Sequence, residues 1–344
     1  MTASAGDDVD GDGGGRPKRA VHGAVTRRQR AGATLSAVAA VPIIDVSGLA
    51  DDDLEVRRAV AREIGRACES IGFLAVGGHG IDAAVVDAAF EQVRRVFDLP
   101  MDDKLALAMD DEHVNRGYDP PGRQRLDAGA SADAKEAWSL SPEHLVGTGP
   151  MSGPNRWPDL DGFREPIERY HREAMALCER LLRAMALSLD LDEGHFERFH
   201  RAPTCTLRLL RYPPRAPDAG DADFGAGAHT DWGAVTVLAQ DDAGSLEVRD
   251  KAGAWVGVPA VPGTLVVNVG DLLQRWTNDR YTSTMHRVLG VPGRERHSIA
   301  CFFDLDHDAL IECLPTCTSP ERPARHEPVT AGEHLERRYL ESVS

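Results

Sequence analysis

Thirteen histidines are spread along the 344 residues, and the pattern His-x-acid occurs four times. Three of these pairs begin at His171, His195 and His334, in stretches with helical character, where side chains two apart splay away from each other. We expect these three histidines to be polar surface residues. The fourth pair, His229 and Asp231, lies at the entrance to a β-type run, and on a strand side chains two apart share a face. This pair is therefore the best candidate for metal chemistry.

A second imidazole comes from His286, which begins another β-type run. Two histidines and one carboxylate on one face of an octahedral metal leave three positions open, an arrangement typical of non-haem Fe(II) oxygenases. O2 and a bidentate co-substrate can then share the metal. We expect no catalytic side chain beyond the iron ligands, which are predicted to be His229, Asp231 and His286.

The only Arg-x-Ser in the chain, Arg296 and Ser298, falls on the next β-type run. The two side chains share a face of that strand. A guanidinium fork beside a hydroxyl matches a carboxylate, and burying this pair without an anionic ligand would be costly. The distal carboxylate of 2-oxoglutarate is the ligand that we expect there.

The elements that must position these residues follow from periodicity. The first half of the chain is mostly helical, with helices expected from Leu54 to Ile71, from a cap at Asp82 to Phe97, and over 163–189. Short strands are expected at 41–45 and 72–76. Closely spaced β-type runs without intervening helices then favour an antiparallel sandwich or barrel, and they cover 204–211, 234–239, 245–248, 255–258, 264–269, 286–291 and 297–303.

Composition narrows the class of partner. A net charge of −16 offers no electrostatic footprint for nucleic acid or an anionic membrane, and no apolar run reaches 18 residues. The six cysteines include no CxxC pair, so the sequence signals neither a disulfide framework nor a zinc site. We expect a cytoplasmic monomer that acts on a small molecule and binds neither nucleic acid nor membrane.

Short sequence motifs outside the candidate metal site also support an oxygenase. The chain resembles the Fe(II)/2-oxoglutarate-dependent oxygenases of the isopenicillin N synthase-like group over residues 41–315. The resemblance rests on Val41–Asp45, Gly72–Gly80, Leu99–Pro100 with Lys104, Arg116–Tyr118, Lys135–Glu136, Asn155–Pro158, Arg211–Pro213, Val267–Asp271 and Asn278–Ser283.

The resemblance implies a mainly β core, a double-stranded β-helix or jelly roll, with N-terminal helices packed around it. We expect a disordered extension at 1–40, a helix-rich region at 41–200, the jelly-roll core at 201–315 and a C-terminal segment with a helix at 316–344. The resemblance makes His229, Asp231 and His286 iron ligands. It assigns co-substrate contacts to Arg296 and Ser298, which bind the C5 carboxylate, and to Tyr212 and Asn268, which orient 2-oxoglutarate.

The expected activity is a dioxygenase that hydroxylates a small molecule, with Fe(II), 2-oxoglutarate and O2, and with ascorbate as a possible reductant. Composition and group membership suggest bacterial specialised metabolism, such as antibiotic biosynthesis. Two alternatives stay open: a 2-oxoglutarate-independent oxidase or cyclase of the isopenicillin N synthase type, and a non-redox jelly-roll metal protein. Residues 331–344 contain no Gln, which weakens the first. Substrate contacts are expected from Arg116, Tyr118, Trp232 and Phe303.

Overall fold

The computed structural model describes residues 41–109, 115–123, 133–143, 153–215 and 224–343. The chain divides into two units, Met1–Ala37 and Val38–Ser344, and the description concerns the second. The extension expected at 1–40 lies outside the described residues.

An eight-stranded sheet, in the order β1-β2-β10-β7-β12-β5-β4-β3, forms the larger layer of the core. All neighbouring pairs are antiparallel except β1 and β2. Four of its strands come from before residue 200, so the helix-rich region also builds the sheet. The strands are β1 (Ile43–Asp45), β2 (Phe73–Gly77), β3 (Gly117–Asp119), β4 (Glu136–Leu140), β5 (Cys205–Tyr212), β7 (Val235–Gln240), β10 (Leu265–Val269) and β12 (Arg296–Phe303).

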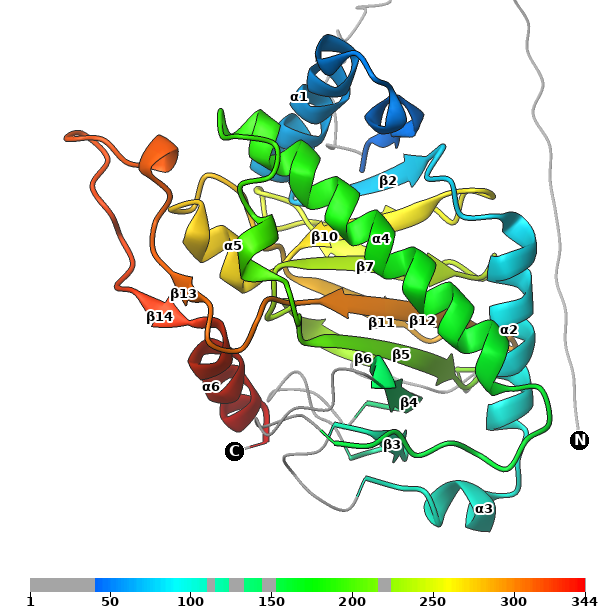
Figure 1. Ribbon diagram of the computed structural model, residues 1–344. Coiled ribbons are helices and arrows are strands. Elements are labelled where there is room, and N and C mark those ends of the chain that lie inside the picture. The colour runs from blue at the N-terminus through cyan, green and yellow to red at the C-terminus, as the bar shows by residue number, and fades with distance from the viewer. Residues whose placement is uncertain (1–40, 110–114, 124–132, 144–152, 216–223, 344) are drawn as a thin grey trace, which may run out of the picture. The chain divides into compact units, whose positions relative to one another are not determined.

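A four-stranded sheet, in the order β6-β11-β8-β9, lies behind the larger one (Figure 1). Its strands are β6 (Phe224–His229), β8 (Leu246–Arg249), β9 (Trp255–Val258) and β11 (His286–Leu289). Together the two sheets form the predicted jelly-roll core. Within the described residues they do not close into a barrel.

Helices cover the other face of the large sheet (Figure 1). They are α1 (Leu54–Ser70), α2 (Ala83–Phe97) and α4 (Arg164–Ser188), of which α4 crosses β7 and β12. Asp53 and Asp82 start α1 and α2, because each carboxylate accepts a hydrogen bond from a backbone N–H of the first turn. The remaining elements are η1 (Ser47–Ala50), α3 (Met101–Leu105), η3 (Glu197–Phe199), α5 (Asp271–Trp276), β13 (Leu310–Ile311), η4 (Pro315–Cys317), β14 (Val329–Thr330) and α6 (Ala331–Val343).

The pairing register of β12 shows which of its side chains face the helices and which face the smaller sheet. Cys301 pairs with Leu207, and Phe303 pairs with Cys205, so these four side chains share one face of the sheet. The alternate positions on β12, from Arg296 to Phe302, belong to the opposite face. One strand therefore supplies both the helix layer and the space between the sheets.

The expected strands and helices are present, with ends shifted by a residue or two. The elements that were not expected include β3, β4, β6, α3, α5, β13 and β14. The surface placement of two histidines is wrong: His171 and His334 are each 5% exposed, while His195 is partly exposed. His171 lies on the buried stripe of α4, and His334 contacts the backbone oxygen of Trp232 at 3.0 Å. None of the described helices is long and apolar enough to cross a bilayer.

Candidate active site

Three segments bring the predicted iron ligands together. His229 ends β6, Asp231 follows in the connection to β7, and His286 begins β11, where it pairs directly with His229. The Asp231 Oδ1 atom lies 3.9 Å from His229 Nε2 and 3.6 Å from His286 Nε2. One donor atom from each residue lies within 4.8 Å of the others, close enough to hold one metal ion.

Backbone carbonyls orient both imidazoles. His229 Nδ1 lies 2.7 Å from the Gly227 oxygen, and His286 Nδ1 lies 3.1 Å from the Thr284 oxygen. A carbonyl can only accept, so each Nδ1 carries the proton and each Nε2 presents a lone pair. Both lone pairs are thereby available to a metal.

Asp231 is held through one oxygen only. Its Oδ2 accepts hydrogen bonds from Thr236 Oγ1 at 2.6 Å and from Asn268 Nδ2 at 2.7 Å. The Oδ1 atom is left facing the two imidazoles. Asn268, expected to orient the co-substrate, therefore positions a carboxylate in this structure, although it also lines the cavity.

The protonation states suit Fe(II). Burial, and then the charge of His286, lower the pKa of His229 to about 3, so its ring is neutral at pH 7. Burial raises the pKa of Asp231, but the two imidazoles and its hydrogen bonds outweigh burial and leave it below its ordinary value. Two imidazole nitrogens and one carboxylate oxygen are the donor set typical of non-haem Fe(II) sites.

Arg296 lies on the cavity face of β12 and is 1% exposed. Its Nε donates to the Gly244 oxygen at 2.8 Å, and its Nη1 donates to Ser298 Oγ at 3.2 Å. The guanidinium also lies 4.7 Å from the centre of the Tyr212 ring. It forms no ion pair with a carboxylate of the described residues, so its charge is available to an anionic ligand.

The cavity between the sheets contains both groups. It is lined by the three candidate ligands, by Arg296 and Ser298, and by Tyr212, Asn268 and Trp232. Three expected substrate contacts, Arg116, Tyr118 and Phe303, are not among its lining residues. Phe303 lies on the same face of β12 as Cys301, toward the helices. The Tyr118 hydroxyl donates a hydrogen bond to Glu136 at 2.5 Å. Arg116 is buried, and its Nη1 donates to the backbone oxygen of Asn115 at 2.6 Å.

Other lining residues were missed at the level of sequence. Arg208 lies on β5 and pairs with Asp119 at 2.7 Å, and alternation along β5 from Tyr212 could have placed it. Leu335 and Tyr339 come from α6, at the C-terminal end of the chain. No pattern in the sequence signals that this helix returns to the cavity.

Comparisons with known proteins agree with this geometry. The model of the 2OG-Fe(II) oxygenase superfamily matches residues 203–305, and the N-terminal model of non-haem dioxygenases in morphine synthesis matches residues 41–160. The 2-oxoglutarate-Fe(II) type oxidoreductase hxnY of Emericella nidulans is 33% identical, covering 88% of this chain and 90% of that protein. The 2-oxoglutarate-dependent dioxygenase citB of Monascus ruber is 36% identical over 80% and 87%.

A solved structure shares the fold. A full-length protein of Neurospora crassa, crystallised in complex with alpha-ketoglutarate (2-oxoglutarate) and thymine, superposes with a TM-score of 0.80 at 30% identity, covering 88% of this chain and 96% of that one. These relatives are fungal, so they give no support to the expected bacterial antibiotic setting. The chain belongs to the family of Fe(II)- and 2-oxoglutarate-dependent oxygenases, and it is a 2-oxoglutarate-dependent dioxygenase.

Proposed function

We propose that the enzyme hydroxylates a small organic molecule held between the two sheets. The observation that carries this proposal is a single cavity lined by the His, Asp, His set and by a buried arginine that forms no ion pair with a carboxylate of the described residues. His229, Asp231 and His286 bind the iron. When bound, the iron supplies the oxidation of a C–H bond, coupled to the decarboxylation of 2-oxoglutarate to succinate.

The protein fixes the geometry of this reaction. The hydrogen bonds at both Nδ1 atoms and at Asp231 Oδ2 keep the three donor atoms converged. Arg296 and Ser298 hold the C5 carboxylate of 2-oxoglutarate, and the Tyr212 ring supports the guanidinium. The co-substrate then reaches from this clamp to the iron.

The primary substrate occupies the remaining part of the cavity. Trp232 and the α6 residues Leu335 and Tyr339 line it with mainly apolar surface, beside the Arg208–Asp119 ion pair. We infer a compact, largely apolar substrate with a polar group that can meet Arg208. The thymine in the Neurospora relative supports a substrate of this size. A cytoplasmic monomer, use of ascorbate and a role in specialised metabolism stay predictions.

Product analysis tests the proposal. Purified protein is supplied with Fe(II), 2-oxoglutarate, O2 and candidate small molecules, and succinate and hydroxylated product are measured together. Equal amounts of the two are expected. Turnover with O2 and a reductant alone, without succinate, would instead assign Arg296 to the primary substrate, as in an oxidase or cyclase.

A further inference from the structure

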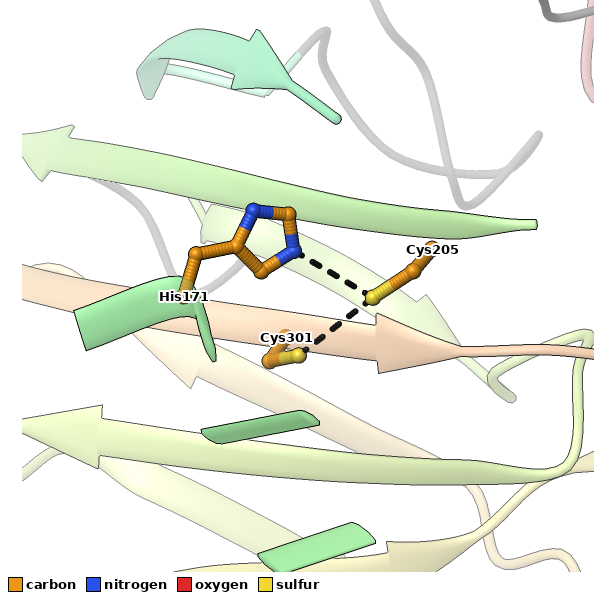
Figure 2. Close-up of side chains that lie close together, drawn as sticks. All are labelled: His171, Cys205 and Cys301. Carbon is orange, nitrogen blue, oxygen red and sulfur yellow. Dashed lines mark hydrogen bonds between the residues drawn. The ribbon is translucent and has the colours of Figure 1, made fainter. Parts of the chain in front are cut away.

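A second group of ligand-type side chains lies on the opposite face of the large sheet. His171 on α4, Cys205 on β5 and Cys301 on β12 point toward one another (Figure 2). A third thiol, Cys178, lies two turns after His171 on the same helix and interacts with Cys301. All four side chains are buried, and we call them the thiol cluster.

The spacing of the thiol cluster matches a tetrahedral metal site. His171 Nε2 lies 3.3 Å from Cys205 Sγ, which lies 3.6 Å from Cys301 Sγ. Zinc bonds to sulfur and imidazole nitrogen require about 3.8 Å between two sulfur atoms and about 3.5 Å between sulfur and nitrogen. Small side-chain adjustments therefore reach metal geometry, whereas a disulfide would need the two sulfur atoms at about 2 Å.

Two buried hydrogen-bond donors beside the thiol cluster lack acceptors. Neutral thiols packed together would not account for these unsatisfied donors. The Tyr170 hydroxyl and Arg116 Nε have no hydrogen-bond acceptor within the part of the chain that the structure describes. Burial, and then the charges of Cys301 and Cys178, raise the pKa of the Tyr170 hydroxyl. Burial lowers the pKa of Arg116 and the charge of Cys205 opposes this lowering, so both donors lie close to the thiol cluster. Both are donors that would stabilise thiolates, and buried orphan donors are costly.

The three thiols share their charge unevenly. Hydrogen bonds from Cys178 and Cys205 lower the pKa of Cys301 well below that of a free thiol, whereas burial and the interaction with Cys301 raise the pKa of Cys178 and of Cys205, so these two thiols lose their protons only when a metal replaces them. A divalent ion with three thiolates and one neutral imidazole carries a net charge of −1. The buried guanidinium of Arg116, which is 3% exposed, can balance that charge.

We propose that the thiol cluster is a closed structural zinc site that fastens α4 to β5 and β12. His171, Cys205 and Cys301 are the preset ligands, and Cys178, which forms a side-chain hydrogen bond with Cys301, is the fourth. Zinc binding replaces the protons of the three thiols. The ion acts as a cross-link between the helix layer and the core, distinct from the iron.

Metal content of the full-length protein tests the site directly. Cells are grown with zinc, and the purified protein is treated with a chelator that strips the open cavity. About one zinc per chain is expected to survive the chelator and to be released only on unfolding, because the ligands are inaccessible. Protein that retains no zinc after this treatment overturns the proposal.

Cobalt identifies the ligands. Growth with cobalt should give protein with thiolate-to-cobalt charge-transfer absorption, which the catalytic site cannot produce because it contains no sulfur. Cys205→Ala and Cys301→Ala should lose this absorption and the tightly held zinc, whereas Cys68→Ala, a buried cysteine outside the cluster, should keep both. If the cluster variants do not fold, the spectrum of the wild-type protein decides. Absence of the band there, or a Cys205–Cys301 disulfide in protein purified in the presence of a reductant, refutes the site.

Discussion

Alternate residues of β5 and β12 line two candidate sites with different chemistry. On the cavity face, Arg208 and Ser298 belong to an open site with nitrogen and oxygen donors. On the helix face, Cys205 and Cys301 belong to a closed cluster with sulfur donors. Open coordination suits catalysis, and closed coordination suits structure. We infer that access to solvent separates the two proposed functions.

The balance of charge differs between the two sites. At the cavity, two imidazole ligands and one carboxylate would leave a bound divalent cation with a net positive charge that can attract an anionic co-substrate. At the thiol cluster, three thiolates would overcompensate the ion, and a buried arginine restores the balance. The surrounding charges thus match the proposed role of each site.

Paired histidine variants should separate the faces most strongly. His286→Ala removes a proposed iron ligand, so we expect turnover to fall to below a tenth of the wild-type rate while the zinc proposed at the thiol cluster remains. His171→Ala should do the reverse, with zinc lost, a lower melting temperature and retained iron. Metal content, succinate release and thermal unfolding measure this. Loss of iron in the His171 variant at a temperature where it is folded would show that the two sites are not independent.

Arg296→Leu is the next largest expected effect and concerns the cavity face alone. It removes a charge-assisted contact worth about 2–3 kcal/mol, which corresponds to a roughly 30- to 150-fold rise in the KM for 2-oxoglutarate. Arg296→Lys should recover only part, because an ammonium lacks the planar fork. Iron content should not change. A KM within about twofold of wild type in the leucine variant would contradict the clamp.

Thr236→Val tests the support of the carboxylate. The valine keeps the shape but removes the 2.6 Å hydrogen bond to Asp231, and loss of such support typically lowers metal affinity about 10- to 100-fold. Fe(II) binding by anaerobic titration measures the change. Cys205→Ala, on the other face of the sheet, is the matched control and should leave iron affinity unchanged. Equal loss in both variants would mean that general destabilisation is responsible.

Sequence patterns predicted those parts of the candidate site in which strand alternation or a short motif determines the position of a side chain. Arg296 and Ser298 share a cavity face because they lie two apart on β12, as expected. The same rule applied further along the strand excludes Phe303, which was expected at the substrate. His171 was assigned to the surface because spacing alone does not reveal which face of α4 is buried.

Contacts between distant segments were beyond the sequence. The thiol cluster draws on three separate elements, so it has no short motif of the CxxC kind. Leu335 and Tyr339 reach the cavity only because α6 returns to it, through contacts such as the 3.1 Å ion pair of Arg338 with Asp271. Such long-range packing depends on the whole fold rather than on local periodicity.

The smallest expected effect concerns Asp304, which follows β12 and lines the cavity. Burial raises its pKa to about 7, and the charge of Asp231 adds to this. Between about pH 4 and pH 7 the folded metal-free protein therefore keeps a proton that the unfolded chain has lost, so stability falls as pH rises through this range. Asp304→Asn resembles the protonated acid at every pH.

The stabilising effect of Asp304→Asn should therefore grow with pH. In metal-free protein, we expect Asp304→Asn to raise the melting temperature by several degrees more at pH 8 than at pH 5, as measured by calorimetry. Asp102→Asn, at an exposed position in α3, is the control and should show no such trend. A gain that is equal at both pH values would mean that the carboxyl group is not held protonated by burial. The cavity would then be better hydrated near Asp304 than the burial of this side chain indicates. The difference in solvent access between the cavity face and the helix face of the large sheet would be correspondingly larger.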